Sequence, residues 1–163
     1  MRRLFVGLLV LSAACQDEPR SPTTPRPGTT AAFFLTVSNG LPVRGSTITV
    51  TANAAALPGG NTVGSFTAQL NYDSAGLRFV AESRLPHGMR AVNALPGQVR
   101  VAGASSDGLG DGRLFAVTFT VLDPKALASL ELVIDELNGS DFSNQLPSDP
   151  RQRTTRFVPA TPK

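Results

Sequence analysis

The sequence predicts an all-β protein, an antiparallel β-sandwich of jelly-roll type with about eight or nine short strands. Stretches of alternating apolar and polar residues recur along the chain, and such alternation is typical of strands with one buried and one solvated face. Turn signals separate these stretches, and the composition includes 15 Gly and 13 Pro. No stretch has the periodicity of an amphipathic helix. These observations favour a sandwich over a helical or mixed fold.

The alternation is clearest in residues 46–54, where Ile48 and Val50 share the face expected to be buried. The full set of expected strands comprises residues 33–37, 46–54, 65–72, 77–81, 98–103, 114–122, 130–134 and 154–158. Residues 105–112 are rich in Gly and Asp and predict a loop, while residues 123–129 predict a single helical turn. A chain of 163 residues without a solenoid-type repeat predicts one domain.

The N-terminal segment predicts a bacterial lipoprotein signal. Two arginines precede an apolar run over residues 4–11, which has the length of a signal-peptide core and is too short to span a membrane. Small residues then precede Cys15, the only cysteine. The segment resembles a lipobox, with Ser12 in place of the usual leucine, and this implies cleavage after residue 14 and a diacylglycerol anchor on Cys15. An unpaired cysteine in an exported protein favours lipidation over a plain secretory signal.

The rest of the chain divides into a tether, a domain and a tail. Residues 15–32 predict a Pro- and Thr-rich tether, 33–158 the folded domain, and 159–163 a short tail. The tether has no large apolar side chain to bury, and at about 3.1 Å per residue its fifteen residues 16–30 extend to ~45 Å. Gln16 after the cysteine resembles the signal for outer-membrane delivery in Gram-negative bacteria. The expected location is the cell envelope, with a lipid anchor in the membrane.

The charge pattern argues against nucleic-acid binding. The formal net charge is +3, but Arg2 and Arg3 lie in the predicted signal peptide, and without them 13 basic residues face 12 acidic ones. The remaining arginines are scattered singly, so no basic stripe follows a phosphate backbone. We therefore expect no nucleic-acid partner.

Three stretches, in order, resemble the cohesin domain, the receptor half of the cohesin–dockerin pair, and related carbohydrate-binding sandwich modules. They are VRGSTITV at residues 43–50, VGSFTAQLNYD with GLRFV at 63–80, and GRLFAVTFTV at 112–121. One departure is Ser74, which stands where the family usually has proline. The resemblance implies a non-catalytic module that binds a dockerin-like or other secreted protein through a sheet face with variable polar residues. No motif in this chain transfers individual dockerin contacts.

Residues of the resemblance are expected to stabilise the fold. The ring of Tyr72 can be buried at a corner while its hydroxyl bonds a backbone group. Asp73 can accept hydrogen bonds from the amides of the bend. Gly112 is expected to let the preceding loop enter the strand at 114–122.

The residues needed for catalysis or a metal centre form no pattern. His87 is the only histidine and lies in a turn-like segment, and no Gly-x-Ser-x-Gly motif supplies a nucleophile. One histidine and one cysteine do not make a zinc site. Asp107 and Asp111 are weak candidates for calcium, since two carboxylates are few for a site of six to eight oxygens. We expect no enzyme activity and no cofactor.

Four arginines are the candidate binding residues. Arg78, Arg84, Arg90 and Arg100 lie in neighbouring segments and, if they share a polar face, would attract an acidic partner. Arginines on separate solvated strands give the same pattern, so both interpretations stand.

Polysaccharide binding is the alternative to protein binding. Sugars stack on flat rows of Trp or Tyr, and this chain has no Trp and one Tyr. The other aromatic candidates are Phe33, Phe34 and Phe142, for which core positions are expected. A structural envelope lipoprotein without a specific ligand is the third alternative.

Overall fold

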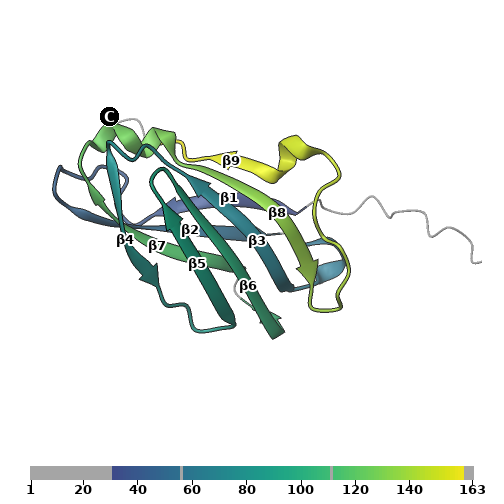
Figure 1. The fold of residues 1–163 in the computed structure, drawn as a ribbon. Coiled ribbons are helices and arrows are strands. Elements are labelled where there is room, and N and C mark those ends of the chain that lie inside the picture. The colour runs from purple at the N-terminus through teal and green to yellow at the C-terminus, as the bar shows by residue number, and fades with distance from the viewer. Residues whose placement is uncertain (1–30, 56, 111, 160–163) are drawn as a thin grey trace, which may run out of the picture.

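The computed structural model describes residues 31–55, 57–110 and 112–159, and that part of the chain forms nine strands (Figure 1). The strands are β1 (Ala32–Val37), β2 (Thr47–Ala55), β3 (Val63–Asn71), β4 (Leu77–Ser83), β5 (Met89–Leu95), β6 (Gln98–Leu109), β7 (Arg113–Val121), β8 (Glu131–Gly139) and β9 (Thr154–Arg156). Short 3-10 helices span Pro58–Gly60, Pro124–Ser129 and Pro150–Arg153. The predicted signal peptide, Cys15, residues 16–30 of the tether, Asp111 and residues 160–163 lie outside the described residues.

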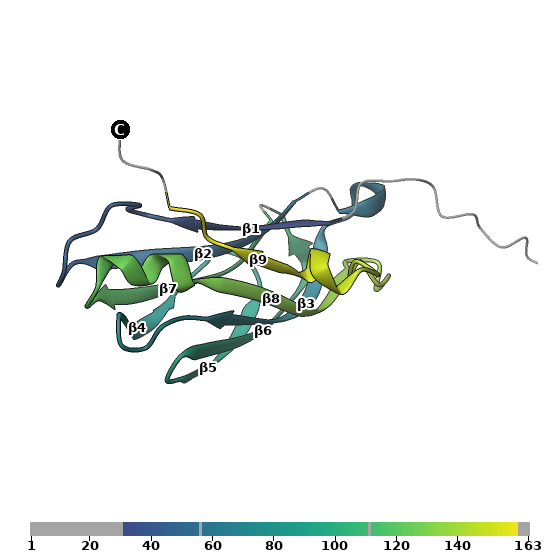
Figure 2. The same ribbon diagram turned by 90° about the horizontal axis from the view of Figure 1, so that it is seen from above.

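The strands form two antiparallel sheets that pack face to face (Figures 1 and 2). The first sheet has the order β1-β2-β7-β4, and the second has the order β5-β6-β3-β8-β9. Consecutive strands β4 and β5 are edges of different sheets, while β1 and β9 lie side by side where the two sheets meet. The predicted all-β jelly-roll sandwich is therefore confirmed. Among the described residues, no helix has the length and apolar character needed to cross a membrane.

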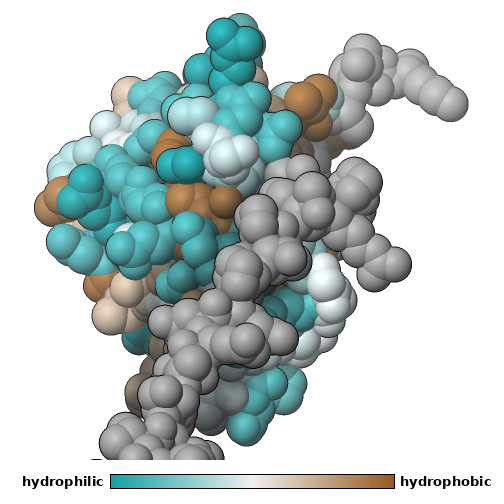
Figure 3. Space-filling view, turned by 90° about the vertical axis from the view of Figure 1, so that its right-hand side faces the viewer, coloured by the Kyte–Doolittle hydropathy of each residue, from teal (hydrophilic) through white to brown (hydrophobic). Residues whose placement is uncertain are grey.

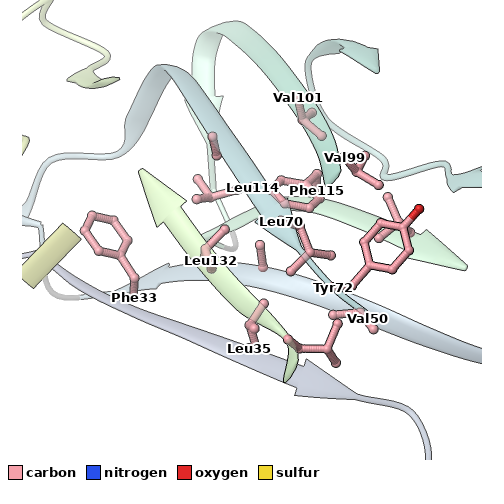
Figure 4. Close-up of a cluster of buried hydrophobic side chains, with 14 of the residues drawn as sticks. Phe33, Leu35, Val50, Leu70, Tyr72, Val99, Val101, Leu114, Phe115 and Leu132 are labelled. Atoms are coloured by element: carbon pink, nitrogen blue, oxygen red, sulfur yellow. The ribbon is translucent and has the colours of Figure 1, made fainter. Parts of the chain in front are cut away.

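The core lies between the sheets and is built from the apolar members of each alternating stretch (Figure 4). Phe115 and Phe119 of β7 are completely buried, as is Leu70 of β3 in the facing sheet. The ring of Phe119 meets the ring of Tyr72 edge to face, with centroids 4.9 Å apart. The inward faces predicted for these strands are confirmed, and the threonines between them point outward.

The corner after β3 forms as the sequence predicts. The Tyr72 hydroxyl donates to the carbonyl oxygen of Leu95 over 3.1 Å, and the amide of Ala75 donates to Asp73 Oδ1 over 2.9 Å. Gly112 has a φ of +71°, and a Cβ at this position would lie 2.4 Å from the carbonyl oxygen of Ala54. The helical turn expected at 123–129 is a 3-10 helix.

Two parts of the second sheet differ from the prediction. Strand β5 was not expected, because its inward side is formed by Arg90 and Val92 and lacks a regular apolar pattern. The prediction of a loop at residues 105–112 is wrong, since β6 continues as far as Leu109 and pairs there with Val63. Glycine at 108 marks a close approach instead, because a Cβ would lie 2.1 Å from Thr62 Oγ1.

Candidate functional site

The outward face of the β5-β6-β3-β8-β9 sheet is the candidate site, and we call it the five-stranded face. Because side chains alternate along a strand, the residues between the core positions of β3, β6 and β8 all point to this face. The burial pattern of β6 illustrates the alternation: Val99 and Val101 are buried, while Arg100 and Ala102 are exposed. One half of the five-stranded face is polar, and the other half is apolar.

The polar half is a network of side-chain hydrogen bonds that crosses four strands. Gln98 Nε2 in β6 donates to Gln69 Oε1 over 2.8 Å and to Asn71 Oδ1 over 3.1 Å. Gln69 Nε2 donates to Asp135 Oδ2 over 2.7 Å, and Asn71 Nδ2 donates to Glu131 Oε2 over 3.4 Å in β8. The network fixes the side-chain positions on this half, so it presents a preformed polar surface.

An ion pair ends the network at the sheet edge. Arg156 Nε in β9 donates to Glu131 Oε1 over 2.9 Å. This hydrogen bond lowers the pKa of the Glu131 carboxyl below its usual value, partial burial opposes the shift, and the hydrogen bond from Asn71 adds to it. Glu131 therefore stays ionised, and β9 is attached to the sheet by both backbone pairing and charge.

Alanine side chains of β5 and β6 form the surface of the apolar half. Ala91 in β5 pairs with Ala102 in β6, and Met89 pairs with Ala104. We call Ala91, Ala102 and Ala104 the alanine strip; Met89 stands at its edge with 80% of its surface exposed. Two shallow hollows of about 300 and 270 Å³ lie over the strip. Small side chains beside an exposed methionine form a surface into which apolar side chains of a partner can insert.

The outward face of the other sheet has a different character. Threonines dominate it: Thr47 pairs with Thr120, and Thr49 pairs with Thr118. Such β-branched hydroxyl residues are typical of a solvated sheet face. The contrast between the faces favours the five-stranded face as the binding surface.

The structure does not bring the four predicted arginines together. Arg78 points outward on the four-stranded sheet opposite Thr120, and Arg84 is exposed in the segment between β4 and β5. Arg100 lies on the five-stranded face. The guanidinium of Arg90 instead donates to the backbone carbonyls of Leu114, of Arg113 over 3.2 Å and of His87 over 2.6 Å. The shared polar face is therefore not formed, and a binding role for Arg100 stays a prediction.

The other predicted positions lie apart from the hydrogen-bond network of the five-stranded face. His87 is exposed before β5, as expected of a turn residue. Asp107 is exposed near the end of β6 and accepts from Ser106 Oγ over 3.3 Å, while Asp111 and Cys15 lie outside the described residues. Within residues 31–55, 57–110 and 112–159, no three His, Cys, Asp or Glu side chains gather as metal ligands would.

The alanine strip was missed by the sequence reasoning because its first strand was missed. One sequence feature could have revealed this strand. Met89, Ala91, Asn93 and Leu95 alternate along it, and the large apolar residues Met89 and Leu95 occupy outward positions of β5. An outward apolar residue on an edge strand is unusual for a solvated face and points to an interface.

The sequence matches no protein-family model and no curated protein sequence. Solved structures nevertheless share its fold. The cohesin module of a family 33 glycoside hydrolase from Clostridium perfringens matches with a TM-score of 0.57 and 18% identity, over 78% of this chain and 95% of that chain. A non-cellulosomal cohesin from the archaeon Archaeoglobus fulgidus matches with a TM-score of 0.53 and 23% identity, over 72% and 83% of the two chains.

A third match is the sixth cohesin of scaffoldin B from Acetivibrio cellulolyticus, solved in complex with a dockerin. Its TM-score is 0.53 and its identity 14%, over 71% of this chain and 92% of that chain. The predicted likeness to cohesins is thus confirmed for the fold. The matched region covers 83–95% of each of these three cohesin chains.

Proposed function

We propose that this chain is a non-catalytic protein-binding module that holds a dockerin-like secreted protein at a bacterial surface. The observation that carries the proposal is the alanine strip with Met89 exposed beside it, on a sheet whose other half is a preformed polar network. A dockerin is bound in the Acetivibrio cellulolyticus structure of similar fold. That complex supports a partner of the same class for this chain.

The chemistry of the five-stranded face defines what would fit it. The strip has room for small or medium apolar side chains of a helix laid across β5 and β6. Glu131, Asp135 and Glu136 are carboxylates along β8, whereas Arg100 and Arg156 are the basic side chains nearby. A partner with an apolar ridge and a mixed polar flank, basic where it meets β8, complements this arrangement.

The anchor completes the proposal. A lipid on Cys15, followed by the Pro-rich tether, would place the module at the outer membrane with its five-stranded face accessible. One such module recruits one partner, in contrast to scaffolds that carry several cohesins in a row.

The test is capture followed by a binding measurement. The purified protein is incubated with the secreted proteins of its own organism in the presence of calcium, and retained proteins are identified by mass spectrometry. The dissociation constant of each candidate is then measured by calorimetry with the unchanged protein and with Ala102→Arg. An arginine on the strip should weaken binding by roughly thirty-fold or more, because it fills the surface and places an unpaired charge in the interface.

The matched control is Thr47→Arg, which adds the same side chain at an exposed position on the other sheet. It should leave the dissociation constant unchanged. Equal weakening by the two variants, or none by either, would contradict the five-stranded face as the docking surface. Retention of no secreted protein at all would favour an envelope protein without a protein ligand.

A further inference from the structure

A third hollow lies at the end of the sandwich where β3 begins and β8 ends. Its volume is about 270 Å³, and its walls come from the start of β3, from β6 and from the loop after β8. Figure 3 looks onto this end of the molecule, where hydrophilic residues predominate and hydrophobic ones appear as small separate patches. The hollow adjoins the alanine strip, because Ala104 lines both.

Two glycines, Gly64 and Gly139, line the hollow. A Cβ at Gly64 would lie 2.4 Å from the carbonyl oxygen of Gly139, so the two backbones are in direct contact. A Cβ at Gly139 would meet the side chains of Asn61 and Asp141 at 2.4 and 2.6 Å. Glycine is therefore required at both positions, because a side chain there would collide with neighbouring protein atoms.

An aromatic ring stands at its rim in a conformation that is unfavourable for an aromatic residue. Phe142 is 91% exposed and has a φ of +63°, the only positive value among the described non-glycine residues. Hydrogen bonds hold the loop in place: the Phe142 amide donates to Gly139 over 2.9 Å, and Asp141 Oδ1 accepts from the Ser143 amide over 2.9 Å. A strained, exposed aromatic residue fixed beside a hollow indicates a contact with a ligand.

Serine hydroxyls supply the polar part of the lining. Ser140 Oγ donates to Asn61 over 3.0 Å, and Ser105 Oγ donates to the carbonyl of Gly108 over 3.1 Å. Ser106 Oγ donates to Asp107 over 3.3 Å. Ser65 Oγ instead accepts from Asn138 Nδ2 over 3.1 Å, which leaves its proton free, so the serines offer a ligand both a hydrogen-bond donor and acceptors. The lining contains no charged side chain, which disfavours an ionic ligand.

We propose that this hollow is a binding subsite for one neutral sugar ring of a polysaccharide. The apolar C–H face of a pyranose would lie on the Phe142 ring, and its hydroxyls would exchange hydrogen bonds with the serines of the rim. The inference goes beyond the proposed function, because it concerns a different class of ligand, although Ala104 of the alanine strip also lines this hollow and the two sites adjoin. A module with both sites would hold its protein partner close to the polysaccharide.

The experiment is calorimetric titration of the purified full-length protein with neutral oligosaccharides: cellohexaose, xylohexaose, mannohexaose and chitohexaose. At least one should bind with a micromolar to millimolar dissociation constant. Phe142→Gly should weaken it tenfold or more, while Phe142→Trp should retain or strengthen it. Glycine suits the positive φ, so the first variant removes the ring without disturbing the loop. Phe34→Ala removes a 44% exposed ring from the other sheet and should have no effect.

The proposal is overturned if none of the four oligosaccharides binds at millimolar concentration, or if Phe142→Gly and Phe34→Ala have equal effects. It is also overturned if an oligogalacturonate binds as tightly, since a charged ligand contradicts the uncharged lining. Ala102→Arg separates the two proposals. Sugar binding that survives this substitution supports the subsite even if no protein partner is found, and loss of protein binding alone leaves the subsite intact.

Discussion

Arg90 in the five-stranded sheet donates its Nε hydrogen to the backbone carbonyl of Leu114 in the four-stranded sheet. The same guanidinium reaches the carbonyls of Arg113 and His87, so one side chain connects both sheets with the turn before β5. An arginine that the sequence presents as a binding residue thus connects the two layers.

Removing this connection should destabilise the fold. Arg90→Ala leaves partly buried carbonyls without donors and should lower the free energy of unfolding by about 2–3 kcal/mol. Arg90→Lys keeps the charge but loses the planar fork and should have an intermediate effect. Urea unfolding followed by circular dichroism measures both. Arg100→Ala, at an exposed position, is the control and should change stability by less than about 0.5 kcal/mol; a similar loss in both variants would contradict the structural role of Arg90.

The core gives a second prediction. Phe119→Ala and Leu70→Ala should each cost roughly 2–5 kcal/mol, because both side chains are completely buried and each substitution leaves a cavity. Leu41→Ala is the comparison, since this leucine is largely exposed and should be close to neutral. Near-neutral effects of the two core substitutions would mean that the inward faces of β3 and β7 are assigned wrongly.

The outcome for individual strands shows what sequence reasoning can and cannot reach. Alternation identified β2, β3 and β7 because each strand buries one face completely. The alternating apolar residues of the sequence are therefore the buried residues of the fold. Alternation missed β5, where an edge strand buries little. The four arginines were grouped because their segments are neighbours in the sequence, but β4 and β5 belong to different sheets.

The candidate site was less accessible than the fold for a related reason. A docking surface is defined by which outward residues of separate strands become neighbours, and that depends on sheet order. Ala91 and Ala102 belong to the same strip only because β5 pairs with β6 in one register. Phe142 was expected in the core, but it is 91% exposed and has a positive φ that no sequence pattern signals.

The Glu131–Arg156 pair predicts a pH dependence of stability. The pKa of Glu131 is lower in the folded state than in the unfolded chain, so the unfolded state binds more protons as the pH falls. The stabilisation is fully present above the unfolded pKa of about 4.3 and is lost as the pH decreases through the folded value. A double-mutant cycle of Glu131→Gln and Arg156→Ala should give a coupling of at most about 1 kcal/mol at pH 7, because the pair is partly exposed.

At a pH below the folded pKa of Glu131 the same cycle should show no coupling, since the carboxyl is then protonated in both states. Urea midpoints at the two pH values provide the comparison. Persistent coupling in acid would show that Arg156 acts through packing against β8 and not through the charge of Glu131.

The anchor is tested separately from the fold. Intact-mass analysis of the membrane fraction should find a chain that begins at Cys15 and carries diacylglycerol and fatty acid, because the thiol follows an apolar run and small residues. Cys15→Ala should release the protein from the membrane or leave its signal uncleaved. A soluble product with an unmodified Cys15 thiol would contradict the lipoprotein assignment.

Phe142 offers a prediction in which stability and binding move in opposite directions. A non-glycine residue at positive φ carries a conformational cost of roughly 1–2 kcal/mol, and glycine removes this cost while adding entropy to the unfolded chain. Phe142→Gly should therefore raise the free energy of unfolding by up to about 1 kcal/mol, since the exposed ring contributes little burial. Phe142→Ala keeps the unfavourable φ and should not stabilise. If urea unfolding shows that Phe142→Gly is as stable as Phe142→Ala or less so, the loop is not strained. A more stable glycine variant that no longer binds sugar would mean that the strain is retained for a ligand contact, as expected where function conflicts with local stability.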